Sequence, residues 1–152
     1  MKPAPPDLAA KLNLAPRSRL FVLNAPAALS VSQKLAGIEV TSAWPRSGEV
    51  RQILAFVTCL AEVEGYAAKI AERAAADAVV WFAYPKGSSK RYTCEFNRDT
   101  GWRALGDKGY EPVRMIAYDE DWSALRFRRV EFIRTMTRKR AISAGGKARV
   151  QA

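Results

Sequence analysis

The chain has 152 residues, of which 49% are apolar and 10% aromatic, and its 25 Lys+Arg against 15 Asp+Glu give a formal net charge of +10. This apolar fraction is enough for a hydrophobic core and excludes a disordered chain, and no apolar run approaches the ~18 residues of a membrane-spanning helix. There is no histidine, which excludes His-based triads, histidine general bases and histidine metal ligands.

The two cysteines, Cys59 and Cys94, predict a reducing location. One pair is not the dense disulfide framework of a small secreted domain, and a structural zinc ion needs about four sulfur or nitrogen ligands. The segment MKPAPPDLAAKL lacks the apolar core of a signal peptide. We therefore expect a cytoplasmic protein with reduced cysteines and no metal site. The alternative is a reactive Cys94, with a pKa lowered by Lys90 and Arg91.

The first part of the chain predicts short helices alternating with strands. Residues 1–6 carry three prolines and are expected to be irregular. A short amphipathic helix is expected between Asp7 and Pro16. The next elements are strands over Arg19–Asn24, Ile38–Ala43 and Gln52–Thr58, with a short helix over Leu29–Leu35. Continuous apolar runs such as RLFVLN are typical of strands buried on both faces of a parallel sheet.

The second part begins with the clearest helix, Ala61–Ala76, where apolar residues recur at helical spacing. It continues with strands over Ala78–Tyr84, Val113–Asp119 and Ala124–Phe132, and a short helix over Asp99–Asp107. In the last strand, apolar residues alternate with Arg126 and Arg128, the pattern of a half-exposed strand. The EDWS turn before it is too short for a parallel crossover, so the last two strands are expected to be antiparallel.

This alternation predicts the α/β class. We expect one three-layer Rossmann-like domain over residues 7–133, with a mainly parallel open sheet of strand order 3-2-1-4-5 and a C-terminal antiparallel strand. Residues 134–152 carry six Lys/Arg and no acid, which leaves a formal +4 on the remaining chain. We expect this basic tail to be disordered.

A doubly wound sheet binds ligands at the carboxyl ends of its strands, where the strand order reverses. The expected order places that crevice between strands one and four, where Asn24–Pro26 meets Tyr84–Lys90. Glycine, hydroxyls and ammonium groups in the second segment suit a small phosphate, sulfate or carboxylate. The alternative is a polar connection without function, because the P-loop spacing is absent. The candidate ligand-binding residues are Asn24, Pro26, Tyr84, Lys86, Ser88, Ser89, Lys90 and Trp122.

Other residues have competing interpretations. Trp81 and Trp102 are expected in the core, whereas Trp122, on a turn, is a candidate for stacking on a ligand. The acids of residues 119–121 are interpreted as a solvated hairpin, with cation binding or acid/base chemistry as the alternative. The basic tail is either a nucleic-acid contact or only solubilising. The candidate nucleic-acid contacts are Arg126, Arg128, Arg138, Lys139 and Arg140.

Three segments carry a resemblance: LNAP (Leu23–Pro26), WFAYPKGSSK (Trp81–Lys90) and DEDWSALRFR (Asp119–Arg128). Through them the chain resembles a family of small uncharacterised bacterial proteins, classed as a domain of unknown function. The resemblance implies a Rossmann-like domain and supplies no catalytic residue. The layout is also similar to class I methyltransferases. However, NAPAALS after the first strand has no glycine and TSAWP after the second has no acid, so S-adenosylmethionine is not expected to bind.

These observations favour a non-catalytic domain that binds a small anionic ligand, or an acidic segment of a partner, at the predicted crevice. The first alternative is a protein that associates with nucleic acid through its tail. The second is a diverged methyltransferase-like enzyme. No catalytic residue, metal, cofactor or membrane association is predicted.

Overall fold

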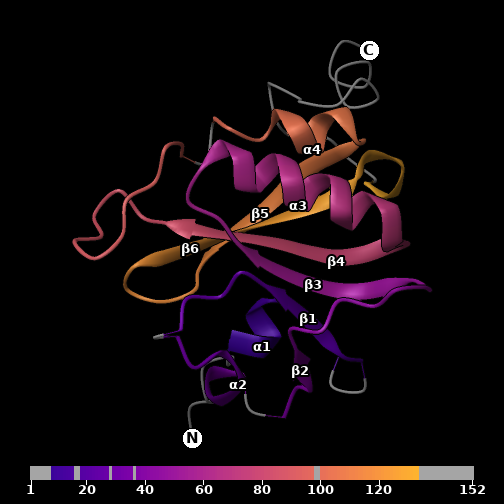
Figure 1. Cartoon of the computed structure of the whole chain (residues 1–152), viewed down its shortest axis with the longest axis horizontal. Coiled ribbons are helices and arrows are strands. Elements are labelled where there is room, and N and C mark those ends of the chain that lie inside the picture. The colour runs from indigo at the N-terminus through magenta and orange to yellow at the C-terminus, as the bar shows by residue number, and fades with distance from the viewer. Residues whose placement is uncertain (1–7, 16–17, 28, 36, 98–99, 134–152) are drawn as a thin grey trace, which may run out of the picture.

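A six-stranded sheet of order β2-β1-β3-β4-β6-β5 runs through the molecule (Figure 1). The structure is a computed structural model that describes residues 8–15, 18–27, 29–35, 37–97 and 100–133. The strands are β1 (Leu20–Leu23), β2 (Val40–Thr41), β3 (Val50–Phe56), β4 (Ala74–Pro85), β5 (Tyr110–Ala117) and β6 (Trp122–Arg129). The helices are α1 (Leu8–Lys11), α2 (Val31–Lys34), α3 (Leu60–Arg73) and α4 (Arg103–Asp107), and a 3₁₀ turn covers Val130–Phe132.

The expected Rossmann-like sheet order is wrong. β3 lies between β1 and β4, with Ile53 opposite Phe21 on one side and Val80 on the other. The reason lies in the burial of each strand. β3 is apolar almost throughout and takes a central place, whereas β2 has only two half-buried residues and lies at the edge. Both β3 and β2 are apolar enough to be recognised as strands, but only β3 has enough apolar surface for the centre of the sheet.

The sheet is also mixed rather than mainly parallel. β1, β2, β3 and β4 run parallel to one another, but β6 runs antiparallel to both β4 and β5. The predicted antiparallel pairing of the last two strands is confirmed. The last strand does not finish the sheet, however, because it is inserted between β4 and β5. Helix α3 ends at Arg73 and β4 begins at Ala74, earlier than the sequence pattern predicts.

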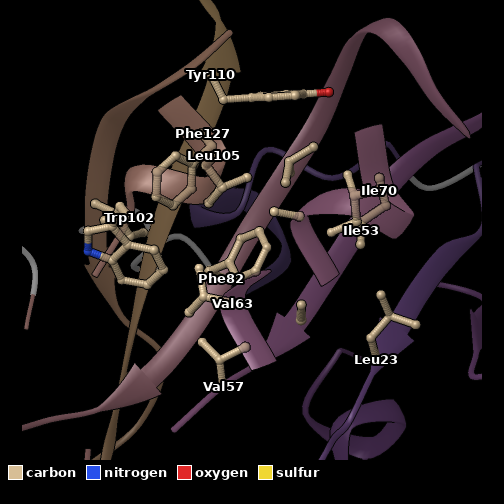
Figure 2. Close-up of a cluster of buried hydrophobic side chains, with 14 of the residues drawn as sticks. Leu23, Ile53, Val57, Val63, Ile70, Phe82, Trp102, Leu105, Tyr110 and Phe127 are labelled. Carbon is tan, nitrogen blue, oxygen red and sulfur yellow. The ribbon is translucent and has the colours of Figure 1, made fainter. Parts of the chain in front are cut away.

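One hydrophobic core lies between the sheet and the helices α3 and α4 (Figure 2). As predicted, α3 buries an apolar stripe, which includes Val63 and Ile70. Trp102 is also buried as predicted, with its ring centroid 5.1 Å from that of Phe127 and 5.9 Å from that of Phe82. Aromatic pairs at this separation add to the stability gained from burial. This core holds α3 firmly over the middle of the sheet.

A second core fills the opposite face of the sheet, beneath α1 and α2. Trp81 is fully buried there, as predicted, and its Nε1 donates to the carbonyl of Leu12 at 2.8 Å. The buried amide of Gln52 accepts from the N–H of Ala15 at 2.5 Å and donates to the carbonyl of Ser18 at 3.1 Å. These bonds fasten the segment between α1 and β1 to the central strand β3.

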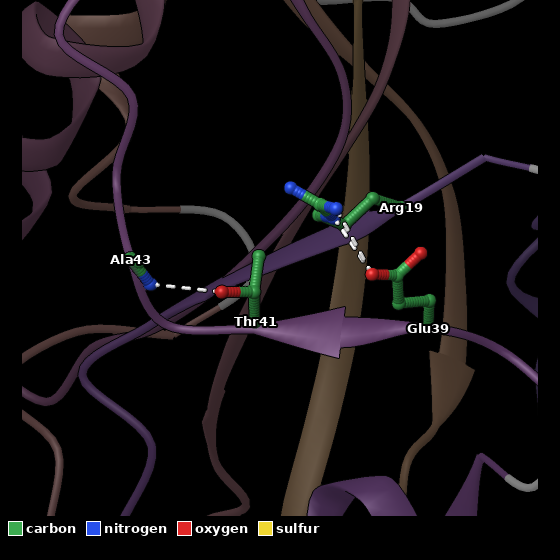
Figure 3. Close-up of polar contacts among 4 residues, drawn as sticks. All are labelled: Arg19, Glu39, Thr41 and Ala43. Carbon is green, nitrogen blue, oxygen red and sulfur yellow. Dashed lines mark hydrogen bonds and ion pairs between the residues drawn. The ribbon is translucent and has the colours of Figure 1, made fainter.

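The β2 edge is held by exposed polar contacts (Figure 3). A guanidinium nitrogen of Arg19 lies 3.0 Å from a carboxylate oxygen of Glu39. The hydroxyl of Thr41 accepts from the N–H of Ala43 at 3.1 Å, which turns the chain away from the sheet. Within the part of the chain that the structure describes, no helix is long and apolar enough to cross a membrane. The predictions for residues 1–6 and 134–152 lie outside the described residues.

Candidate functional site

Asn24 directly follows β1 and adopts a left-handed backbone conformation with φ of 61°, which asparagine tolerates better than most residues. Its side-chain nitrogen donates to the carbonyl of Phe56 at 2.9 Å and to the carboxylate of Glu62 at 2.5 Å. Both amide hydrogens therefore have acceptors within the protein. Asn24 joins the ends of β1 and β3 to the start of α3, and in this structure its amide does not face an open site.

Glu62 is the centre of that junction. Its carboxylate also accepts the backbone N–H of Thr58 at 2.8 Å and the Thr58 hydroxyl at 3.1 Å. Burial acts to raise the pKa of Glu62, but hydrogen bonds from Thr58, Asn24 and Cys59 together hold this pKa below its ordinary value. The carboxylate therefore stays charged in the first turn of α3, where the helix dipole favours a negative charge.

The polar loop after β4 is fastened to the β5–β6 hairpin. The backbone N–H of Lys86 donates to the carbonyl of Asp121 at 2.8 Å, and the hydroxyl of Ser89 donates to the carboxylate of Asp121 at 2.9 Å. The Ser89 hydroxyl also accepts the N–H of Tyr92 at 3.2 Å. Ser89 thus organises the loop, while Ser88 and Lys90 lie exposed on it.

Tyr84 and Trp122 lie on opposite faces of the sheet. Tyr84 belongs to the core under α3 and α4, and its hydroxyl donates to the sulfur of Met115 at 3.3 Å. Trp122 belongs to the second core and is only 1% exposed, with its ring centroid 5.2 Å from that of Phe56. The predicted ligand-binding residues therefore do not form one cluster. The expected crevice between strands one and four is absent, because β3 separates those strands.

An open groove lies between the segment that follows β1 and the β5–β6 hairpin. It has a volume of about 390 Å³ and is lined by Leu29, Ser30, Gln33, Lys34, Tyr118 and Asp119. A neighbouring hollow of about 420 Å³ shares Leu29, Ser30 and Gln33 with it and reaches Pro26. The ammonium group of Lys34 lies 5.1 Å from the centre of the Tyr118 ring. Pro26, one of the predicted ligand-binding residues, lines the second hollow.

Two buried donors on the hairpin that lines the groove have no acceptor among the described residues. These are the Tyr118 hydroxyl and Nε1 of Trp122. Both rings pack edge-on against Phe56, with centroid separations of 5.5 Å and 5.2 Å. A buried donor without an acceptor costs about 1–3 kcal/mol. Burial, assisted by the charge of Asp119, raises the pKa of Tyr118 to about 12, so its hydroxyl remains a donor at neutral pH.

The acidic hairpin has a structural role in this arrangement. One carboxylate oxygen of Asp119 accepts the N–H groups of Asp121 and Trp122, both at 2.8 Å. These bonds form the turn that brings Trp122 under the Lys86–Tyr92 loop. Sequence reasoning singled out Asp119 and Trp122 but missed Lys34, Gln33 and Tyr118. Nothing in the local sequence marks them, because the groove arises where segments distant in the chain meet.

The predicted nucleic-acid residues on β6 lie on one face of the sheet. Arg126 stands opposite Trp81 of β4 and opposite Arg114 of β5. Its Nε is buried and finds no acceptor within the described part of the chain. Burial, together with the charges of Arg128 and Arg114, lowers the pKa of Arg126. Arg128 donates through two nitrogens to the carboxylate of Asp77, each at 2.7 Å. Arg138, Lys139 and Arg140 lie outside the described residues.

Cys59 and Cys94 are unpaired and half-buried. The predicted lowering of the Cys94 pKa by Lys90 and Arg91 is wrong. Burial raises this pKa, and the nearby carboxylates of Glu95 and Glu62 act in the same direction. The thiol faces acidic neighbours rather than the basic ones next to it in sequence.

The chain was also compared with known proteins. Neither a protein-family model nor a curated protein matches it. The resemblance of its three segments to an uncharacterised bacterial family thus stays a prediction.

Proposed function

We propose that the protein binds a small ligand with a carboxylate or phosphate group in the groove between Lys34 and Tyr118. The observation that carries this proposal is the pair of buried donors, Tyr118 hydroxyl and Trp122 Nε1, that find no acceptor among the described residues. Native proteins rarely leave such groups unpaired, and each one calls for an explanation. An anionic oxygen in the groove supplies the missing acceptor for Tyr118, which lines it.

The composition of the groove agrees with a small anionic ligand. Lys34 provides a positive charge and Ser30 and Gln33 provide donors, and a volume of about 390 Å³ lies within the ordinary range for small-molecule sites. Asp119 also lines the groove, and its charge is partly offset by the two backbone N–H groups that it accepts. It suits a ligand that carries a hydrogen-bond donor beside its anionic group. The proposal assigns no catalytic residue, and a reducing cytoplasmic location is part of it.

The test is a thermal-shift screen of the full chain with inorganic phosphate, citrate and adenosine monophosphate. A ligand at about 100 times its Kd stabilises by about 2.7 kcal/mol, which for this size raises Tm by roughly 5–10 °C. We expect Lys34→Ala and Tyr118→Phe to remove most of the shift. Lys69→Ala is the matched control, because the Lys69 ammonium also lies over an aromatic ring, 5.5 Å from the centre of Trp44. A shift that persists in both groove variants, or no shift at all, would contradict the proposal.

A second candidate function is association with nucleic acid through β5 and β6. It is favoured by Arg114 and Arg126, which stand directly opposite each other although like charges across a strand pair are destabilising. Phosphate oxygens would relieve this repulsion and pair the buried Nε of Arg126. Asp77 reduces the local positive charge, but its carboxylate is already held by Arg128.

This candidate is tested by the salt dependence of binding to a single-stranded oligonucleotide, measured by fluorescence anisotropy. We expect the Arg114→Ala/Arg126→Ala variant to bind more weakly, with a slope of log K against log salt reduced by about 1.4, or 0.7 per lost contact. Arg19→Ala is the control, because that guanidinium is already paired with Glu39. Deleting residues 134–152 tests the tail alternative separately. If only the deletion changes the slope, the tail binds and the sheet arginines do not.

A further inference from the structure

The fold brings the two cysteines of the chain to the same place. They are 35 positions apart in sequence, yet both lie at the start of α3. Cys59 is the N-cap residue of α3, in an extended conformation with φ of −140° and ψ of 161°. Cys94 lies within the segment that connects β4 to α4 and packs against the core under α3.

Glu95 fixes the position of Cys94 relative to Cys59. Its backbone N–H donates to the carbonyl of Thr58 at 3.0 Å, and its carboxylate accepts the backbone N–H of Leu60, also at 3.0 Å. The residue after Cys94 is therefore hydrogen-bonded to the residues on both sides of Cys59. This arrangement holds the two segments side by side at the two thiols.

The electrostatics agree with this placement. The Cys59 side chain contributes to the lowered pKa of Glu62, and the charge of Glu62 contributes to the raised pKa of Cys94. Glu62 therefore interacts with the side chains of both cysteines. Both cysteines are half-buried rather than sealed in the core, so a small oxidant has access to them.

We propose that Cys59 and Cys94 form a dithiol pair that closes to an intramolecular disulfide when a small-molecule disulfide, such as oxidised glutathione, is in excess. The thiolate of one cysteine attacks the glutathione disulfide, which releases one glutathione thiol and leaves a mixed disulfide. The second cysteine then attacks the protein sulfur of that mixed disulfide and releases the second glutathione thiol. The protein loses two electrons and two protons, and the oxidant gains them.

Formation of the disulfide would change the junction around Glu62 at the start of α3. The loop after β4 becomes covalently joined to the start of α3, beside the carboxylate of Glu62. That loop is also bonded to the β5–β6 hairpin through Asp121.

The experiment equilibrates the reduced full chain with glutathione buffers of increasing oxidised fraction. Free thiols are counted in denaturant, and intact mass and mobility on a non-reducing gel are recorded. We expect both thiols to disappear together, the mass to fall by two hydrogen atoms, the chain to run as a monomer, and dithiothreitol to reverse all three changes. Wild-type chains that instead carry glutathione on one or both cysteines, or link to a second chain, would overturn the proposal.

Two conservative variants complete the test. Cys59→Ser and Cys94→Ser are each expected to remain folded by circular dichroism and to accumulate a single glutathione adduct, because the resolving thiol is absent. Urea unfolding tests independently whether the two sulfurs meet in the native fold. An intramolecular disulfide that fits the native fold raises the urea midpoint of the oxidised chain, since it restricts the unfolded state, whereas a midpoint lowered by oxidation would show that the two sulfurs do not meet in the native fold.

Discussion

Replacing Trp122 with alanine is expected to lower the free energy of unfolding by about 3–5 kcal/mol, the range for a large aromatic residue removed from a core. Trp122 is 1% exposed and its ring contacts those of Phe56 and Tyr92, at centroid separations of 5.2 and 4.9 Å. The variant leaves a cavity between the hairpin and the loop after β4. Urea unfolding followed by circular dichroism measures the loss.

The matched variant is Trp122→Phe, which retains an aromatic ring and removes the unpaired Nε1 donor. We expect it to cost clearly less than the alanine variant, because one ring stays in the core and a buried unpaired donor is removed. A loss as large as that of the alanine variant would mean that Nε1 has an acceptor in the folded protein. That result would also remove the main support for the proposed ligand site.

Raising the pH from about 10 to 12 is expected to reduce stability through Tyr118. Its pKa is 10.0 in the unfolded chain and about 12 in the folded protein, so the unfolded state loses its proton first. The resulting destabilisation is absent well below pH 10 and grows as pH rises toward 12. A shift of this size corresponds to about 2–3 kcal/mol.

The measurement is the difference in unfolding free energy between wild type and Tyr118→Phe as a function of pH. Tyr66 and Tyr110 also have raised pKa values because of burial, and the difference removes their contribution. Below pH 10 we expect the phenylalanine variant to be at least as stable as wild type, because it lacks the unpaired hydroxyl. A difference that does not change between pH 10 and 12 would show that the Tyr118 hydroxyl is solvated.

The residues changed in these variants, Trp122 and Tyr118, belong to the hairpin formed by β5 and β6. This hairpin contacts both the groove and the loop after β4. Asp119 shapes its turn, Tyr118 lines the groove, Asp121 holds the Lys86–Tyr92 loop, and Trp122 packs beneath that loop. Stability and ligand binding should therefore be linked in this region. A ligand that satisfies the Tyr118 and Trp122 donors is expected to stabilise the wild type more than either conservative variant.

The candidate site could be predicted only in part. Trp122 and the loop Tyr84–Lys90 were recognised from their residue types, whereas Asp119 was interpreted as part of a solvated hairpin. The structure does connect the loop to the hairpin. Their roles differ from the expectation, because Ser89 and Asn24 are engaged by the protein itself. Lys34 and Tyr118 carry no local signal, and whether a buried donor lacks an acceptor depends on every neighbour around it.

The sequence by itself determined where the strands and the main helix lie, because apolar runs and helical spacing are local consequences of burial. It also determined the antiparallel pairing of β5 and β6, since a turn of a few residues permits no other connection. Only the tertiary structure decided the order of the strands. Burying the apolar strand β3 between β1 and β4 stabilises the fold more than placing the half-buried strand β2 there would. This difference in stability depends on the packing of the whole sheet. The groove and the meeting of the two cysteines follow from that order, so neither is visible in any local segment.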